Sequence, residues 1–479
     1  KANIKEVKML NDSSIYLRAL LVGDAYILKM ISGVYRIHSK NISSNLDVEF
    51  IIENIEEKYK IYEEIVKRNL LDNPKEWLKN QALLTISFFF KFNKTEEKEI
   101  NKLIEWCKNN LKEIKDEIIE HIGGIIMNKK IFIMAYSRKN LGDDIFIKMI
   151  LEKYPNFQFY MKIPDENFLE WLTMKYKNLH VLKGEDTDEE LYKSNVEDYD
   201  AYIYVGGSIF MEGGKVYNLS PKFYDFVKRC KEKNIPFCYI SSNYGPYQTE
   251  EYFELSRKNF KACTDICFRD KYSYNLFQDI PNVRYAPDYA FSYNLVPQEK
   301  IEKSVGISVI DLNIRDYLKD KSSIYYKWLL NNINAYIKEG YSIYLYSFCE
   351  HEKDEETIDY LMKELGEDKN IKDVRYRGNI DDFLELYAKM EYMICSRFHA
   401  MVLSSVANQK MYVTSYSNKI SNVIDDLNLD IPLLNLKNIK ENDIVKLNEF
   451  KSIDKEKIDR IRINAKQQVK VLANYLEKL

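Results

Sequence analysis

The feature of the sequence that most constrains the fold is an alternation of short apolar runs with amphipathic stretches, which begins near residue 128. The apolar runs have the length and composition of buried strands: KIFIMAY, FQFYMKI, LHVLKG, DAYIYVGG, IPFCYISS, DICFRD and VRYAPD. Amphipathic stretches typical of helices, such as GDDIFIKMILEKY and PKFYDFVKRCKEKN, lie between several of them. This alternation predicts a doubly wound parallel sheet.

A second series of the same kind starts near residue 304, with strand-like runs SVGISVI, YSIYLYSF, VRYRG, YMICS and KMYVTSY. Helical stretches are expected between them, around 325–338, 353–365, 380–389 and 399–407. We therefore expect an α/β protein with two Rossmann-like doubly wound domains, 128–300 and 301–479, that face each other across a cleft. In such folds ligands bind at the C-terminal ends of the strands.

The segment before residue 128 has helical periodicity instead, with apolar residues at three- and four-residue spacing. It predicts three helices, the second starting after Asn73 as N-cap and the third ending at Gly123-Gly124. We expect a helical spacer or small bundle over 47–127. The apolar stretch 82–92 could touch a membrane surface or form the core of that bundle, but no apolar run reaches the ~20 residues that span a bilayer.

Composition excludes several classes of protein. Lys and Arg number 71 against 74 Asp and Glu, so the net charge of −3 argues against a nucleic-acid partner. Only 15 glycines and 10 prolines exclude a collagen-like or low-complexity chain. Seven scattered cysteines without metal-ligand spacing predict free core thiols, no metal site and a cytoplasmic location.

The residues with the clearest chemistry follow the strand YMICS, in the stretch SRFHAMVLSSVANQK. Arg397 and His399 fall at the expected strand-to-helix turn, and Lys419 follows the next strand at the same edge of the sheet. A helix N-terminus and nearby cations favour an anion. We expect Arg397 and Lys419 to hold phosphate and carboxylate groups, with His399 as proton donor; the alternative is a surface turn with ordinary charges.

Loops of the first domain supply further candidates. Arg269 follows a strand and faces the expected cleft, although it could simply pair with Asp270. Asn140 and Asp143 in NLGDDIF could bind sugar hydroxyls or merely cap a helix. The loop YVGGSIFMEGG holds four of the glycines, and its Gly206, Gly207 and Ser208 allow a close approach of backbone to ligand.

Together these motifs resemble the polysaccharide pyruvyl transferase family, from about residue 128 to the C-terminus. The matching pieces are NLGDDIF, GGSIF, NYGPY, FRDKYS, PDYAF, SFCEHEKDEE and SRFHAMVLSSVANQK with Lys419. The resemblance implies a GT-B-like fold and metal-independent transfer of pyruvate from phosphoenolpyruvate to a sugar as a ketal, with release of phosphate and no cofactor. It implies that Arg269, Arg397 and Lys419 bind phosphoenolpyruvate and that His399 protonates its methylene carbon.

The acceptor would then be a glycan or lipid-linked saccharide of a bacterial surface polysaccharide, bound by Asn140, Asp143, Gly206, Gly207 and Ser208. With such an acceptor, the enzyme is expected in the cytoplasm, with peripheral contact at the inner face of the cell membrane as a further possibility.

Residues 1–46 resemble the C-terminal part of a family 2 (GT-A) glycosyltransferase. Asp12 matches the position of the catalytic base, Arg18 the arginine of the same helix, and YRIH at 35–38 a later motif. Because the nucleotide-binding half is missing and the chain starts at Lys1, we expect the remnant of a glycosyltransferase module fused to the pyruvyl transferase.

Two other functions remain open from the sequence. One is an ordinary GT-B glycosyltransferase that uses a sugar nucleotide, although its donor domain usually carries acidic residues where 396–419 is basic. The other is a scaffold that assembles partners through its helical segment.

Overall fold

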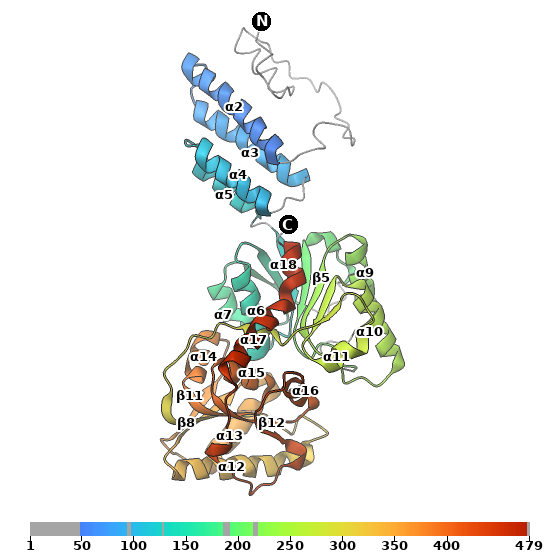
Figure 1. The fold of residues 1–479 in the computed structure, drawn as a ribbon, viewed down its shortest axis with the longest axis vertical. Coiled ribbons are helices and arrows are strands. Elements are labelled where there is room, and N and C mark those ends of the chain that lie inside the picture. Colours follow the sequence, from blue (N-terminus) through green and yellow to red (C-terminus); the bar gives the residue numbers. More distant parts are fainter. Residues whose placement is uncertain (1–47, 93–96, 127–128, 185–191, 214–218, 477–479) are drawn as a thin grey trace. The chain divides into compact units, whose positions relative to one another are not determined.

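The computed structural model of the chain describes residues 48–92, 97–126, 129–184, 192–213 and 219–476. They include two compact units, a helical one within 48–126 and a larger one of residues 130–473 (Figure 1). The expected glycosyltransferase remnant at 1–46 lies outside the described residues. Of the helices within these ranges, none combines the length and apolar character needed to cross a membrane.

The helical unit contains four helices around one apolar core. They are α2 (Val48–Arg68), α3 (Pro74–Phe92), α4 (Glu97–Asn110) and α5 (Lys115–Ile126). Asn73 caps α3 as expected, because its Oδ1 accepts a hydrogen bond from the Glu76 amide at 3.2 Å. Ala82 and Ile86 of the apolar stretch are buried in the core, while Leu84 is 65% exposed. Bundle packing therefore accounts for one face of that stretch.

The expected third helix is wrong in two respects. It breaks into α4 and α5 at residues 111–114, where both Leu111 and Ile114 turn into the core. It also does not stop at Gly123-Gly124, since α5 runs through both glycines to Ile126. A mid-helix glycine costs only about 1 kcal/mol, which the packing of Ile118 and Ile122 into the core can offset.

The larger unit contains two parallel sheets, as the sequence predicts. The first has the order β3-β2-β1-β4-β5-β6-β7 and the second the order β10-β9-β8-β11-β12-β13. The strands of the first sheet are β1 (Lys130–Met134), β2 (Gln158–Ile163), β3 (Leu179–Lys183), β4 (Ala201–Val205), β5 (Phe237–Ser242), β6 (Asp265–Phe268) and β7 (Val283–Tyr285). Those of the second are β8 (Ile301–Ser308), β9 (Ser342–Ser347), β10 (Ile371–Arg375), β11 (Met390–Cys395), β12 (Lys410–Ser415) and β13 (Leu433–Asn435).

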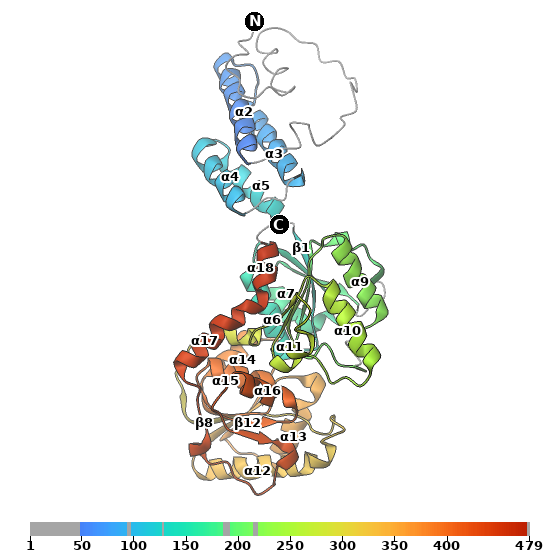
Figure 2. The same cartoon turned by 45° about the vertical axis from the view of Figure 1, so that its right-hand side comes forward.

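Helices cover both faces of each sheet. Around the first sheet, α6 (Leu141–Lys153) and α7 (Glu170–Lys175) lie on one side, and α9 (Pro221–Glu232) and α10 (Glu250–Ala262) on the other (Figures 1 and 2). Ser220 and Thr249 cap α9 and α10 with their hydroxyl groups. With both faces of the sheet covered, the central strand β4 is apolar, and every one of its residues is buried.

The second sheet is covered in the same way. Its helices are α12 (Ser322–Lys338), α13 (Asp354–Leu365), α14 (Ile380–Ala388), α15 (Phe398–Val406) and α16 (Asn418–Asp426). In both sheets the strand order reverses once, between β1 and β4 and between β8 and β11. Such reversals open a crevice at the C-terminal ends of the strands. The unit is thus two Rossmann-like domains of the GT-B type.

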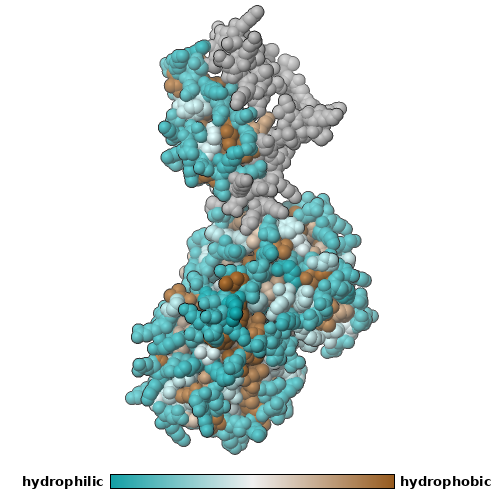
Figure 3. Space-filling view, in the orientation of Figure 1, coloured by the Kyte–Doolittle hydropathy of each residue, from teal (hydrophilic) through white to brown (hydrophobic). Residues whose placement is uncertain are grey.

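The boundary expected at residue 301 coincides with the start of β8, but the end of the chain does not stay with the second sheet. After α17 (Lys455–Ala465), the segment 466–469 returns to the first sheet. There Gln468 Oε1 accepts from the Ser241 amide at 2.9 Å, and its Nε2 donates to the Ala286 carbonyl at 2.7 Å. The face of the larger unit that Figure 3 shows is mainly hydrophilic.

Candidate active site

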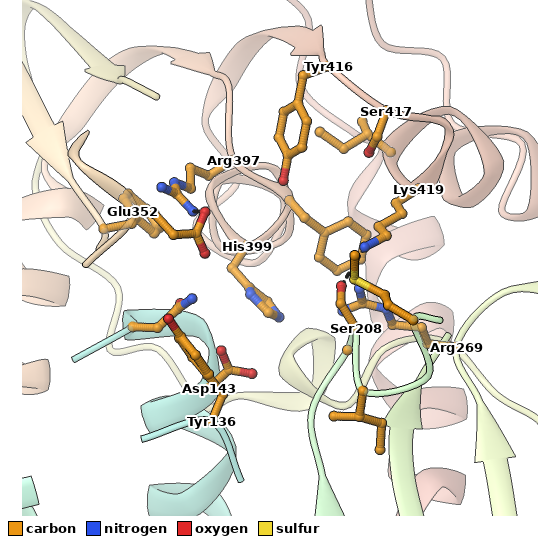
Figure 4. A pocket seen from close by; sticks show the side chains of 17 residues that line it. Tyr136, Asp143, Ser208, Arg269, Glu352, Arg397, His399, Tyr416, Ser417 and Lys419 are labelled. Carbon is orange, nitrogen blue, oxygen red and sulfur yellow. Dashed lines mark hydrogen bonds and ion pairs between the residues drawn. The ribbon is translucent and has the colours of Figure 1, made fainter. Parts of the chain in front are cut away.

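A cavity of about 300 Å³ opens where the C-terminal edges of the two sheets face each other. Its wall is built by the loops after β1, β4 and β6 of the first sheet and after β9, β11 and β12 of the second (Figure 4). This volume lies at the lower end of the range for ligand sites and suits a compact molecule.

Eight of the nine residues predicted for the site line this one cavity: Asn140, Asp143, Gly207, Ser208, Arg269, Arg397, His399 and Lys419. Gly206 is not among the lining residues, but it precedes Gly207 in the chain and has a φ of +151°, which residues other than glycine rarely adopt. The residues expected on the donor side and on the acceptor side are therefore not separated into two pockets.

Arg397 forms the N-cap of α15 and is buried among acids. Its Nη1 donates to Glu352 Oε2 at 2.7 Å, and its Nη2 donates to Asp354 Oδ1. The Nε atom is buried without a hydrogen-bond partner among the described residues. Burial alone would lower the pKa of this guanidinium, but the two acids raise it well above its usual value.

Arg269, directly after β6, is held by a different set of contacts. Its Nη1 donates to Asp288 Oδ2 at 2.9 Å and its Nη2 to Asn243 Oδ1 at 2.7 Å. The guanidinium also stacks on the Phe398 ring, 4.2 Å from its centroid. Asp270 does not pair with it but caps α11 (Lys271–Phe277) instead. A β-carbon at Gly207 would overlap the guanidinium, so any larger residue there would displace Arg269 from this position.

Lys419, in the first turn of α16, reaches from the second sheet to the first. Its Nζ donates to Ser208 Oγ at 2.5 Å. Burial lowers the pKa of this amine to about 8, and the neighbouring Arg269 acts in the same direction. The charges of Glu352 and Asp270 oppose this decrease, but within the described part of the chain neither carboxylate forms an ion pair with the amine. The ammonium group is therefore a cation that can attract an anion into the cavity.

His399, in the first turn of α15, lies between Arg397 and Asp143 in the cavity (Figure 4). Its ring packs edge-on against Phe146, with the centroids 5.2 Å apart. A β-carbon at Gly142 would overlap the imidazole. The Nε2 atom is buried and has no hydrogen-bond partner in the described part of the chain, the nearest acid oxygen being Asp288 Oδ1 at 3.8 Å. Burial lowers the pKa of His399 to about 4.

Asp143 projects from the first turn of α6 into the cavity. Burial raises the pKa of its carboxyl to about 7; Arg269 opposes this rise, while Glu352 and Asp288 add to it. The neighbouring Asn140 caps α6 by accepting a hydrogen bond from the Gly142 amide at 3.1 Å. The capping role that the sequence left open is thus present, and Asn140 also lines the cavity.

The acids that hold the arginines were not predicted from the sequence. Glu352 and Asp354 hold Arg397, and Asp288 holds Arg269. Glu352 and Asp354 lie in SFCEHEKDEE and Asp288 in PDYAF, motifs that carried the family resemblance but no assigned role. Arg315, which pairs with Glu352 at 3.0 Å, follows β8 and gave no motif signal.

The fold and the cleft define a two-domain α/β protein of the GT-B type with a cationic, histidine-containing site between its sheets. The family profile described as "Polysaccharide pyruvyl transferase" matches residues 138–418. The chain belongs to the polysaccharide pyruvyl transferase family, and this places it among the transferases of polysaccharide biosynthesis.

Several solved structures align with most of this chain at low identity. MurG of Acinetobacter baumannii is 12% identical, with a TM-score of 0.38, and the match covers 73% of this chain and 100% of that one. A putative UDP-N-acetylglucosamine 2-epimerase from Listeria monocytogenes is 11% identical, with a TM-score of 0.45 and coverages of 73% and 97%. HepE of Anabaena, in complex with UDP and glucose, is 10% identical, with a TM-score of 0.44 and coverages of 74% and 100%.

Proposed function

We propose that this enzyme transfers the pyruvyl group of phosphoenolpyruvate to a sugar of a bacterial surface polysaccharide or its lipid-linked precursor. The observation that carries the proposal is the convergence of Arg269, Arg397 and Lys419 around His399 in one small cavity. Phosphoenolpyruvate is a compact molecule with a phosphate and a carboxylate, and three cations around one small cavity match it. We propose that these side chains supply the positive charge without a metal or cofactor.

Binding of the donor also changes the protonation of His399, so that the imidazole can act as an acid. In the unliganded site the imidazole is neutral at pH 7, because burial lowers its pKa to about 4. A bound trianion next to the ring favours the protonated form and raises that pKa. The proton would then be present when phosphoenolpyruvate is bound and absent when it is not.

The reaction proceeds in two steps at C2 of the donor, an addition across the C2–C3 double bond and then a substitution that releases phosphate. His399 gives its proton to the methylene carbon C3, which becomes a methyl group, while a sugar hydroxyl oxygen bonds to C2 and loses its proton to Asp143. A second hydroxyl of the same sugar then bonds to C2, and the bond from C2 to the phosphate oxygen breaks. Phosphate leaves with the proton of the second hydroxyl, and the sugar carries a ketal. Asp143 then releases its proton to solvent, and His399 takes up a proton again when the next donor binds.

Asp143 suits the proton-accepting role because its pKa of about 7 lies near the working pH of an enzyme of this kind. Asn140 and Ser208 line the same cavity and offer polar atoms to sugar hydroxyls. The acceptor would enter from the side of the first sheet, whose loops carry these three residues.

A sugar-nucleotide glycosyltransferase is the second candidate, since the two-sheet fold also suits that reaction. Thermal unfolding with phosphoenolpyruvate, and separately with UDP-sugars and CMP-sugars, distinguishes the two. A ligand at 100 times its dissociation constant stabilises the fold by about 2.7 kcal/mol. We expect only phosphoenolpyruvate to raise the melting temperature, and His399→Ala to bind it without releasing phosphate. Stabilisation by a sugar nucleotide alone would favour the second candidate, and no effect of any ligand would favour the scaffold.

A further inference from the structure

Glu352 holds two arginines at the cavity wall with one oxygen. Its Oε2 accepts from Arg397 Nη1 at 2.7 Å and from Arg315 Nη2 at 3.0 Å. The two guanidinium groups come from different loops, after β11 and after β8, yet both donate to the same point beside the cavity. Two such donors on one oxygen form a site for an anionic oxygen atom.

The second acid on Arg397 is held quite differently. Asp354 is fully buried, and its Oδ2 accepts from the backbone amides of Phe348 and Cys349 at 3.0 and 3.1 Å. The Glu352 side chain is 29% exposed, and no backbone amide in the described residues donates to its carboxylate. Asp354 is therefore a permanent partner of Arg397, whereas Glu352 can be released towards the cavity.

We propose that Arg315 and Arg397 form a two-arginine clamp for an anionic group of the donor, and that Glu352 is the internal counter-ion which the donor displaces. The inference deepens the proposed function and rests on it for the identity of the anion. In the empty site Glu352 satisfies both arginines, so their charges are not left unpaired. The exchange makes a strongly charged anion the preferred occupant, because a weak one does not compensate for the lost ion pairs.

Removal of the Glu352 charge leaves both arginines with other partners. Arg397 keeps Asp354. Arg315 keeps a hydrogen bond to the Asp311 carbonyl and its stacking on Tyr416, 4.4 Å from the ring centroid. Glu352→Gln is therefore expected to fold. If Glu352 leaves the two arginines free for a tenth of the time in the wild type, an anion binds there about tenfold more weakly than in a variant whose arginines are always free.

The test is isothermal titration calorimetry of the full chain at pH 7 with phosphoenolpyruvate and, separately, with inorganic phosphate. We expect Glu352→Gln to tighten phosphoenolpyruvate about tenfold and to tighten phosphate by a similar factor, because neither anion then has to displace the counter-ion. Arg315→Gln should weaken phosphoenolpyruvate about tenfold. The matched control is Glu350→Gln in the same turn, since Glu350 is 57% exposed and pairs instead with Arg377 at 3.7 Å; its affinity should not change.

The outcomes separate the two proposals. Unchanged or weaker binding of phosphoenolpyruvate by Glu352→Gln overturns the clamp and leaves the proposed function intact. If neither protein binds phosphoenolpyruvate but Glu352→Gln binds phosphate more tightly, the clamp holds and the proposed donor is wrong. Binding of neither anion by either protein overturns both. Should Arg315→Gln unfold, Arg315→Lys keeps the charge but loses the paired donors, and the same loss of affinity is expected.

Discussion

Lys419 and Ser208 join the two sheets across the cavity, with Nζ of the lysine 2.5 Å from Oγ of the serine. One follows β12 of the second sheet and the other β4 of the first. The hydroxyl satisfies one donor of the ammonium group but adds no negative charge. The lysine is thus held in place while its charge stays available to a ligand.

Lys419→Ala should therefore lower kcat/KM for phosphoenolpyruvate, because it removes a charge from a desolvated anion site. The expected loss of transition-state stabilisation is about 2–4 kcal/mol. Ser208→Ala should cost about 1 kcal/mol or less, since only one hydrogen bond is lost. Initial rates of phosphate release measure both. A loss below threefold in Lys419→Ala would contradict its role in binding the donor.

The affinity for phosphoenolpyruvate should fall as the pH rises through about 8, the pKa to which burial lowers Lys419. Above this pH the amine is neutral and the attraction to the anion is lost. Calorimetric titrations between pH 6.5 and 9.5 would show this limb in the wild type. Lys419→Ala binds weakly throughout and should lack it, whereas a limb of the same size in the variant would assign it to another group.

His399 should make the fold less stable in acid. Its pKa is about 4 in the folded protein and 6.5 in the unfolded chain, so the unfolded state binds the extra proton between these values. The free energy of unfolding contributed by this group is therefore constant above pH 6.5 and falls by roughly 3 kcal/mol as the pH drops to 4. Urea denaturation of wild type and His399→Gln across this range measures the difference. Parallel pH dependences in the two proteins would refute the burial of a neutral imidazole.

Arg269 and Asp288 are both almost fully buried, at 4% and 0% side-chain exposure. Arg269→Met should destabilise the fold by about 3–5 kcal/mol, because it leaves the carboxylate unpaired. Adding Asp288→Asn removes that charge while keeping the oxygen that accepts from the Ala290 amide. We therefore expect the double variant to be more stable than Arg269→Met alone. Simple additivity of the two single effects in urea denaturation would show that the pair is not coupled.

The sequence could predict the sheets and most of the site for the same physical reason. In a parallel sheet buried on both faces, strands are apolar runs, and the polar residues that follow them gather at one edge. Arg269, Arg397, His399 and Lys419 were found in this way, each just after a strand or the turn that follows it. The sheet order and the meeting of two such edges then bring them together.

The acids that hold the arginines could not be assigned in the same way. Glu352 and Arg397 are 45 residues apart, and their contact depends on how the loop after β9 lies against the loop after β11. The four helices described in the N-terminal unit have a similar cause, because the break after Asn110 places both Leu111 and Ile114 in the core, a packing arrangement that periodicity alone does not indicate. The return of Gln468 to the first sheet likewise depends on hydrogen bonds to distant backbone atoms.

Gly142 offers a test of how closely the position of His399 controls the reaction. A β-carbon at this residue would overlap the imidazole ring. The glycine lies in α6 of the first domain, whereas His399 lies in α15 of the second. Gly142→Ala should therefore push the ring away from the donor and reduce kcat by about 100-fold, as expected for a displaced general acid, with a smaller effect on KM. The matched control is Gly123→Ala in α5, where the added carbon meets no atom within 4 Å. That variant should keep full activity and gain up to about 1 kcal/mol of helix stability. Phosphate release and thermal unfolding of both variants decide the matter: full activity in Gly142→Ala would mean that His399 does not need the place in which the structure holds it.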